Sequence, residues 1–131
     1  MEYRIDLDST HSVIRLTVTA EIVTLELAEE IYTRLTRLSS SGGPYAAIYD
    51  LSAAKDTTIP TEMIMSYARR RPAVPMGRPH VVVGNAPVIF GLAREFQMCR
   101  ENRYGLFDVV HTLKEAYKIA KVRPKDFTEC L

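Results

Sequence analysis

Tryptophan is absent from this 131-residue sequence, cysteine occurs only twice, and no long run of uncharged apolar residues is present. Two cysteines are too few for a disulfide-dense scaffold, and we expect Cys99 and Cys130 to be free thiols, with a single disulfide as the alternative. A spanning helix needs about 18 apolar residues, and the residues after Met1 lack the apolar core of a signal peptide. We therefore expect a cytoplasmic protein without stable membrane insertion.

An excess of charge of either sign is also missing. Seventeen Lys and Arg residues oppose 16 Asp and Glu residues, which leaves a formal net charge of +1. Such a chain has no global field that would attract nucleic acid or anionic lipid. The one dense basic run, Arg69 to Arg71 with Arg78 nearby, is expected to close a helix and to complement its dipole. We expect no nucleic-acid partner.

Signatures of catalysis and of cofactor binding are missing as well. His11, His80 and His111 stand far apart, without the His-x-x-x-His or Cys-x-x-Cys spacing that brings metal ligands together. The sequence has no Gly-x-Ser-x-Gly motif and no glycine-rich phosphate loop. We expect no metal site, no cofactor and no enzymatic activity.

What is present is a regular alternation of apolar patterns. Residues 3–7 and 14–18 alternate apolar with polar side chains around a turn at residues 8–11, which predicts an antiparallel hairpin with one solvent-facing side. From Thr24 the apolar period becomes helical, which predicts a helix over about residues 24 to 41 with Thr24 as its cap.

The second half of the chain alternates continuous apolar strands with helices. The strands are expected at residues 45–49, 81–83 and 107–110, and such all-apolar strands are typical of a parallel sheet covered by crossover helices. The sequence thus predicts one α/β domain over residues 1–121 with the order β-β-α-β-α-β-α-β-α and a mixed sheet. Residues 122–131 are polar, contain Pro124 and are expected to form a C-terminal tail.

With this order, the chain resembles the STAS superfamily (sulfate transporter and anti-sigma-factor antagonist), and especially its SpoIIAA-like branch. The resemblance covers about residues 3–121 and is carried by the opening hairpin with Glu21-Ile22-Val23-Thr24, by Tyr49-Asp50-Leu51-Ser52, by residues 84–96 and by residues 106–116. It implies four helices largely on one side of the sheet. It also implies a non-enzymatic regulatory module that binds a protein partner of unknown identity.

The resemblance further implies a phosphorylation site. In bacterial antagonists of this family, a Ser or Thr that follows an Asp at the start of the second helix is phosphorylated to switch partner binding. The nearest match is Asp56-Thr57-Thr58, so Ser52, Asp56, Thr57 and Thr58 become the candidates for phosphorylation or partner contact. The alternative is that Thr57 or Thr58 only caps that helix.

Asp50 and Asn85 are candidates for a second reason. Parallel neighbouring strands bring their carboxyl ends together at the rim where open α/β sheets bind ligands. Asp50 has the alternative role of a strand-end residue that bonds nearby N–H groups, and an enzyme that uses Asp50 with Asn85 is a weaker interpretation.

A small apolar ligand is the alternative to a protein partner. Met63, Met65, Met76 and Met98 are adaptable side chains that are able to line an apolar groove, although core filling is their ordinary role. The SpoIIAA-like branch is also often grouped with lipid-transfer domains of the SEC14 type. The alternative function is therefore a SEC14-like binder of lipid or of another small apolar ligand. The exposed first strands also favour a homodimer.

Overall fold

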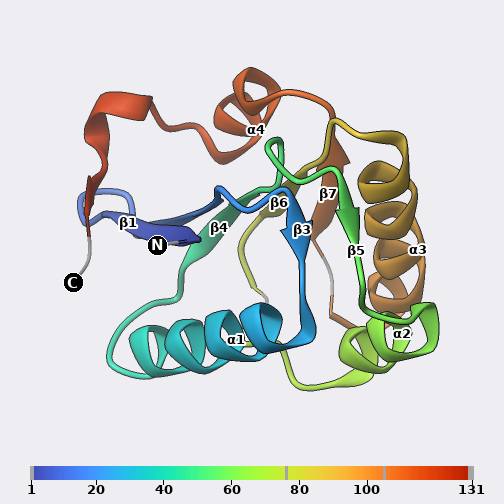
Figure 1. Cartoon of the computed structure of the whole chain (residues 1–131). Coiled ribbons are helices and arrows are strands. Elements are labelled where there is room, and N and C mark those ends of the chain that lie inside the picture. Colours follow the sequence, from blue (N-terminus) through green and yellow to red (C-terminus); the bar gives the residue numbers. More distant parts are fainter. Residues whose placement is uncertain (1, 76, 105, 130–131) are drawn as a thin grey trace.

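A six-stranded mixed sheet forms the centre of the protein (Figure 1). The computed structural model of the chain describes residues 2–75, 77–104 and 106–129. β1 is antiparallel to both of its neighbours, while β2, β4, β6 and β7 run parallel to one another, which confirms the predicted fold class. In spatial order the strands are β7 (Phe107–Val110), β6 (His80–Val83), β4 (Ala46–Asp50), β2 (Val13–Val18), β1 (Tyr3–Asp8) and β8 (Thr128–Glu129).

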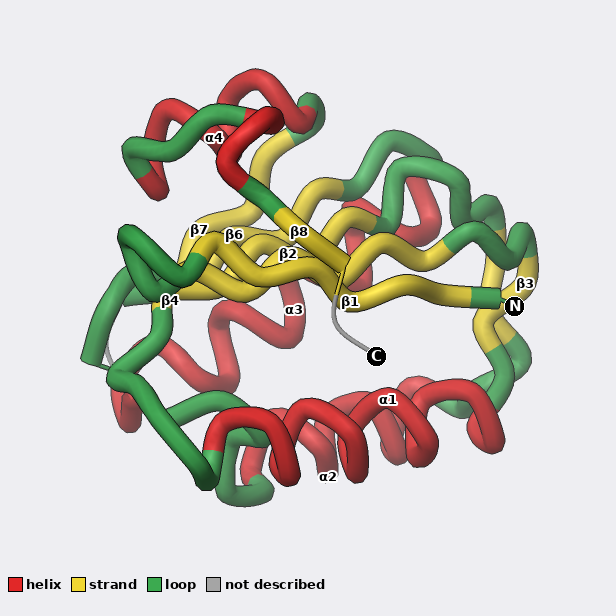
Figure 2. Tube along the Cα trace, turned by 90° about the vertical axis from the view of Figure 1, so that its left-hand side faces the viewer, coloured by secondary structure: helices red, strands yellow, loops and turns green. Residues whose placement is uncertain are grey.

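Helices cover the two faces of the sheet unequally (Figure 2). The helices α1, α2 and α3 lie beneath one face, and α4 lies on the opposite face. Within the described ranges, none of them has both the length and the apolar character needed to cross a lipid bilayer. Their bounds are α1 (Leu25–Ser39), α2 (Thr61–Arg69), α3 (Pro87–Tyr104) and α4 (Leu113–Ala120).

Helix α1 forms where the apolar period predicts it. The side chain of Thr24 accepts a hydrogen bond from the backbone N–H of Leu27 at 3.2 Å, which confirms the predicted cap. Leu27, Ile31 and Leu35 recur every fourth residue, so they share one face, and all three are buried against the sheet. Burial of each such side chain contributes about 1.5 to 3 kcal/mol to the free energy of unfolding.

The polar side of the hairpin is buried in part, whereas the alternation predicts a solvent-facing side, and Arg4 on this side is exposed. Asp6 and Asp8 are only 3% and 1% exposed because α4 and the residues after it cover this side of β1 and β2. The guanidinium of Arg15 donates to Asp6 at 2.7 Å and to the Tyr117 hydroxyl at 2.7 Å, and it lies 4.4 Å from the centre of the Phe127 ring. A charged cluster thus joins the sheet to the C-terminal part of the chain.

The residues expected as a tail belong to the domain as far as the structure describes them. Val122 is buried with the core on the α4 side, and a short 3₁₀ turn (Pro124–Asp126) leads to β8, which pairs with Asp6 and Leu7 of β1. The apolar side chains of Val122 and Phe127 account for this docking, because both pack against the core beneath α4. Pairing with β8 also covers part of the hairpin edge that favours a homodimer.

A second, two-stranded sheet lies beside the central one. β3 (Ile22–Val23) and β5 (Asp56–Thr57) pair in parallel, just before α1 and α2 respectively. Each strand has only two residues, too few for an alternating pattern, and the sequence interpretation misses both. This small sheet fixes the segment that contains the phosphorylation candidates.

Candidate functional site

An apolar cavity of about 310 Å³ lies between the central sheet and the helices α1, α2 and α3. Folded interiors rarely contain voids much larger than a water molecule, and ligand pockets begin at roughly 300 Å³. The cavity is therefore a candidate binding site. Its apolar lining includes Leu16, Val18 and Val82 from the sheet, Ala28, Ile31 and Leu35 from α1, Ile64 from α2, and Ile89, Leu92, Ala93 and Phe96 from α3.

Small side chains leave this space open. Alanine lines the cavity at three positions that are distant in sequence: Ala28 on α1, Ala73 after α2 and Ala93 on α3. Met63, Met65 and Met98 are not among the lining residues, and Met76 lies outside the described residues, so the methionines that the structure describes do not form the groove that was the alternative to core filling. The sequence pattern of each helix shows that its face is apolar, but not that three small residues converge.

Polar side chains lie together at one end of the cavity. His80, at the start of β6, is 1% exposed, and its Nδ1 lies 2.8 Å from the hydroxyl oxygen of Tyr49 in β4. Arg100, near the end of α3, is 6% exposed, donates to the carbonyl of Tyr67 at 3.0 Å and lies over the ring of Phe96. Tyr49, His80 and Arg100 all line the cavity. The cavity is thus apolar along its length and polar at the end where β6 begins.

The imidazole of His80 is neutral at pH 7. Burial lowers its pKa from 6.5 to about 4, the nearby carbonyl of Pro75 opposes this shift, and the positive charge of Arg100 adds to it. Burial also raises the pKa of the Tyr49 hydroxyl, which therefore keeps its proton and is able to donate it to Nδ1. A neutral imidazole accepts at one nitrogen and donates at the other, so in this arrangement Nε2 carries the proton.

The stability of the protein is expected to fall in acid because of His80. Its pKa is lower in the folded chain than in the unfolded chain, so the unfolded state takes up the proton first as the pH falls from 6.5 towards 4. Between pH 7.5 and 4.5 this costs about 2 to 3 kcal/mol of unfolding free energy. Urea denaturation at both pH values measures the loss.

Replacement by glutamine isolates the contribution of His80. His80→Gln should lose less stability than the unaltered protein over the same pH interval, whereas the exposed His111→Gln should behave like the unaltered protein. Equal acid sensitivity of all three proteins would show that His80 titrates normally in the folded state.

The strand-end rim brings together the residues that the sequence predicts there. β4 and β6 are neighbours with Asp50 opposite Val83, so Asn85 follows at the same edge, where its side chain is exposed. The buried carboxylate of Asp50 accepts hydrogen bonds from the backbone N–H of Ser52 at 3.0 Å and from its hydroxyl at 2.6 Å. These bonds match the strand-end alternative for Asp50.

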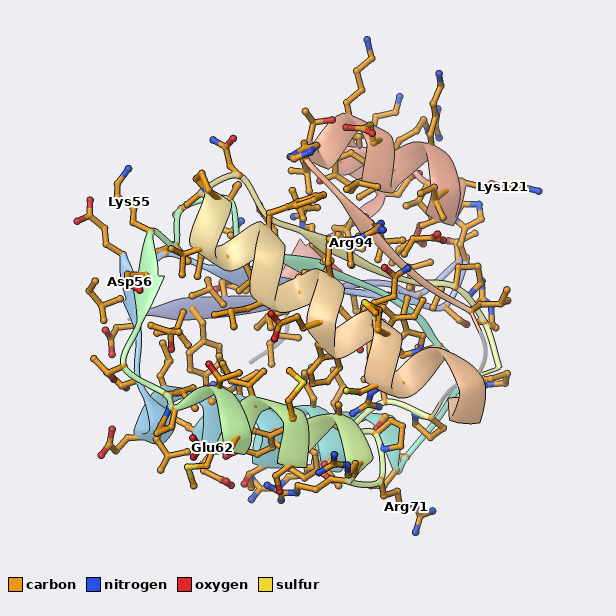
Figure 3. The ribbon with its side chains drawn as sticks, turned by 90° about the vertical axis from the view of Figure 1, so that its right-hand side faces the viewer. Lys55, Asp56, Glu62, Arg71, Arg94 and Lys121 are labelled. Atoms are coloured by element: carbon orange, nitrogen blue, oxygen red, sulfur yellow. The ribbon has the colours of Figure 1, made fainter. Side chains whose placement is uncertain are left out.

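Neither threonine caps α2, contrary to the alternative that the sequence favours. The helix begins at Thr61, and the residue before it, Pro60, makes no side-chain cap. The Thr57 hydroxyl instead donates to the carbonyl of Val23 at 2.7 Å and accepts from the N–H of Ile59 at 3.1 Å, because pairing of β5 with β3 holds Thr57 in a strand. The side chains of Asp56 and Thr58 are exposed, and Figure 3 shows Asp56 at this edge.

The two threonines are expected to differ in their effect on stability. Thr57→Val should lower the free energy of unfolding by about 1 kcal/mol or more, because it removes a hydroxyl that is both donor and acceptor and leaves two backbone groups without it. Thr58→Val, which changes an exposed side chain by the same atoms, should have an effect within about 0.5 kcal/mol. Thermal unfolding of the two variants measures the difference in stability. Equal losses in Thr57→Val and Thr58→Val would contradict the hydrogen bonds of the Thr57 hydroxyl.

The basic run is partly engaged within the protein. Arg70, which follows α2, donates to Glu29 of α1 at 3.1 Å and stacks over the rings of Tyr32 and Tyr67. Arg78 donates to two backbone carbonyls in neighbouring loops. The contacts of Arg70 join α2 to α1, and those of Arg78 join the loops that precede β2 and β4.

One group of possible metal ligands occurs among the described residues. Single ligand atoms of Asp8, His11 and Asp126 lie within 4.8 Å of one another. Asp8 accepts from the backbone N–H of His11 at 3.0 Å and lies 2.6 Å from its ring nitrogen, and Asp126 accepts from Arg123. Because these bonds already satisfy both carboxylates, we assign no metal to the group. Asp126 is far from Asp8 and His11 in the sequence, so residue spacing alone does not reveal this group.

The two cysteines are not seen as a pair. Cys99 is a free, partly buried thiol whose sulfur lies 3.3 Å from that of Met65, and Cys130 lies outside the described residues. The contact between Cys99 and Met65 joins α3 to α2.

The chain matches no protein-family model, no curated protein and no solved structure. The resemblance to the STAS superfamily therefore rests on the sequence motifs and the order of elements.

Proposed function

We propose that this chain is a non-enzymatic, STAS-like binding module that holds a small apolar ligand between its sheet and the helices α1, α2 and α3. The observation that carries the proposal is the cavity of about 310 Å³. Nearly all of the surface that lines this space is apolar, so a ligand that covers it removes apolar surface from water.

The lining indicates the character of the ligand. Aliphatic and aromatic side chains surround most of the space, and they favour a molecule with little polarity along its length. At about 30 Å³ for each water-sized unit, the cavity has room for about ten non-hydrogen atoms. The ligand is therefore a small molecule and not a complete membrane lipid.

Calorimetric titration with indole tests this proposal. Indole is compact and largely apolar, and its size suits the cavity. We expect saturable binding of one indole per chain, and no binding of glucose, a polar molecule of comparable size. Absence of saturable indole binding, or equal binding of glucose, would overturn the proposal.

A protein partner at the strand-end rim is the second candidate. Three of the exposed large apolar side chains lie on elements at this end: Ile22 in β3, Met63 in the first turn of α2 and Val88 in the first turn of α3. Exposed apolar groups beside Ser52, Asp56 and Thr58 suit a protein contact. Thr58 is the better candidate for phosphorylation, because the Thr57 hydroxyl is bonded to Val23.

Affinity purification from a lysate of the native organism tests this second function. The unaltered protein should retain a partner that Asp56→Lys and Thr58→Glu lose, while a substitution on the opposite face, such as Lys118→Glu, should leave capture unchanged. Capture that is insensitive to both rim substitutions would overturn the assignment of the rim.

A further inference from the structure

Two tyrosines of the cavity wall direct their hydroxyl groups to bonds at the protein surface. Tyr32 of α1 and Tyr67 of α2 both line the cavity. The Tyr32 hydroxyl donates to the carbonyl of Arg71 at 2.5 Å, and the Tyr67 hydroxyl donates to the carboxylate of Glu29. Both bonds lie at exposed positions. Each hydroxyl has a single O–H to donate, so neither is able to donate to a molecule inside the cavity.

The polar groups at the start of β6 are engaged in the same way. The hydroxyl of Tyr49 donates to Nδ1 of His80 at 2.8 Å. His80 Nε2 and Arg100 Nε have almost no accessible surface, so a molecule in the cavity does not reach them. Arg100 also donates to the carbonyl of Tyr67 at 3.0 Å, and its guanidinium lies over the ring of Phe96. These bonds therefore run between protein groups and not towards the cavity.

At the strand-end rim, polar groups of the lining are bonded as well. The Thr57 hydroxyl donates to the carbonyl of Val23 at 2.7 Å and accepts from the backbone N–H of Ile59 at 3.1 Å. The backbone N–H of Leu51 donates to the carbonyl of Val83 at 2.9 Å. Nearly all of the accessible surface around the space is accordingly apolar. A hydrogen-bond acceptor that enters the cavity thus loses its bonds to water and meets an apolar wall, which lowers its affinity.

We infer that the ligand is a compact hydrocarbon, without a hydrogen-bond acceptor such as a carboxylate, a carbonyl or a ring nitrogen. This inference rests on the proposed function and narrows the chemical class of its ligand. The volume sets the size, because it has room for about ten non-hydrogen atoms. Aromatic as well as aliphatic side chains line the space, so both planar and puckered rings suit it. Naphthalene and limonene, both of this size, are the probes that fit this description.

Binding of two matched pairs of probes to the whole protein tests this inference. Quinoline has the shape of naphthalene with one nitrogen acceptor, and carvone has the skeleton of limonene with one carbonyl. Equilibrium dialysis measures the affinities, and partition of each probe from water into cyclohexane gives the affinity ratio expected for a space that supplies no donor. Naphthalene and limonene should bind about tenfold or more tightly than their partners, and the ratio should follow partition to within about threefold.

The hydrocarbon inference and the proposed function fail in different ways in this experiment. If quinoline or carvone binds about tenfold more tightly than its partition predicts, the cavity supplies a donor, and the hydrocarbon inference fails while the proposed function stands. If neither the hydrocarbons nor their partners bind, the proposed function fails as well.

Removal of single hydroxyl groups tests the same inference from the side of the protein. Tyr49→Phe and Thr57→Val each remove a hydroxyl from the lining, and Tyr45→Phe is the matched control outside it. Because the lining hydroxyls are bonded to protein groups, the ratio of limonene to carvone affinity should change by less than about threefold in all three variants. A selective loss of carvone binding of about tenfold in Tyr49→Phe or Thr57→Val would overturn the inference. The matched probes on the unaltered protein decide the question even if a variant does not fold.

Discussion

Replacement of Ala93 by phenylalanine is expected to abolish binding of small apolar ligands and to raise the free energy of unfolding by about 1 kcal/mol. Ala93 lines the cavity from α3, and an aromatic ring at this position would occupy space that the fold leaves open. Most enlargements in a filled core destabilise by about 1 to 3 kcal/mol, because they force neighbours to move. A gain in stability coupled to a loss of binding is thus particular to a real cavity.

Gly91→Ala is the matched control for this experiment. Gly91 lies on the same helix, is exposed, and a methyl group added there would meet no atom within 4 Å. The change should stabilise the helix by about 0.5 to 1 kcal/mol and leave binding intact. Urea denaturation and indole titration of both variants separate cavity filling from helix propensity. If Ala93→Phe destabilised the protein and still bound indole as before, the cavity would not be the binding site.

Asp6→Asn is expected to cost about 3 kcal/mol of unfolding free energy, the largest loss that we expect from a single substitution. The Asp6 carboxylate is buried and accepts from Nη2 of Arg15 at 2.7 Å, from its Nε at 3.2 Å and from Arg4 at 3.2 Å. Asparagine keeps the shape but removes the charge, and so leaves the guanidinium of Arg15 largely buried without its counter-ion.

The same substitution should loosen the C-terminal part of the domain. Arg15 bonds the hydroxyl of Tyr117 and stacks on Phe127, so its displacement disturbs both α4 and the approach to β8. Amide hydrogen exchange should therefore become faster in residues 122–129. Asp108→Asn, at an exposed position of β7, should stay within about 0.5 kcal/mol of the unaltered protein. If Asp6→Asn lost no more unfolding free energy than Asp108→Asn, the result would contradict the account of the buried pair Asp6 and Arg15.

The sequence predicts the elements whose apolar periodicity is strong. The hairpin, α1 with its Thr24 cap, and the all-apolar strands all lie where the pattern places them. The pattern does not show which face of the sheet a later helix covers. For this reason the alternation of Asp6 and Arg15 predicts a solvent-facing side, although α4 and Phe127 bury it.

The candidate site is harder to predict because it is assembled from distant segments. Ala28, Ala73 and Ala93 are small residues in three separate parts of the sequence, and only the fold brings them around one space. His80 carries the one usable signal, since a histidine that opens the apolar run Val81 to Val83 is a polar residue in a strand otherwise expected to be buried. The rim residues, by contrast, follow from the rule that neighbouring parallel strands end together.

Methyl NMR of the unaltered protein during titration with indole tests the central claim most directly. Val82 lines the cavity, while its neighbours Val81 and Val83 pack in the core on the opposite face of the sheet, so one strand supplies both the reporter and its controls. We predict that the methyl resonances of Val82, Ile31 and Ile89 shift in a saturable way, with those of Val81 and Val83 nearly unchanged. Shifts confined to other surfaces, or spread equally over all three valines, would contradict a ligand between the sheet and the helices α1, α2 and α3.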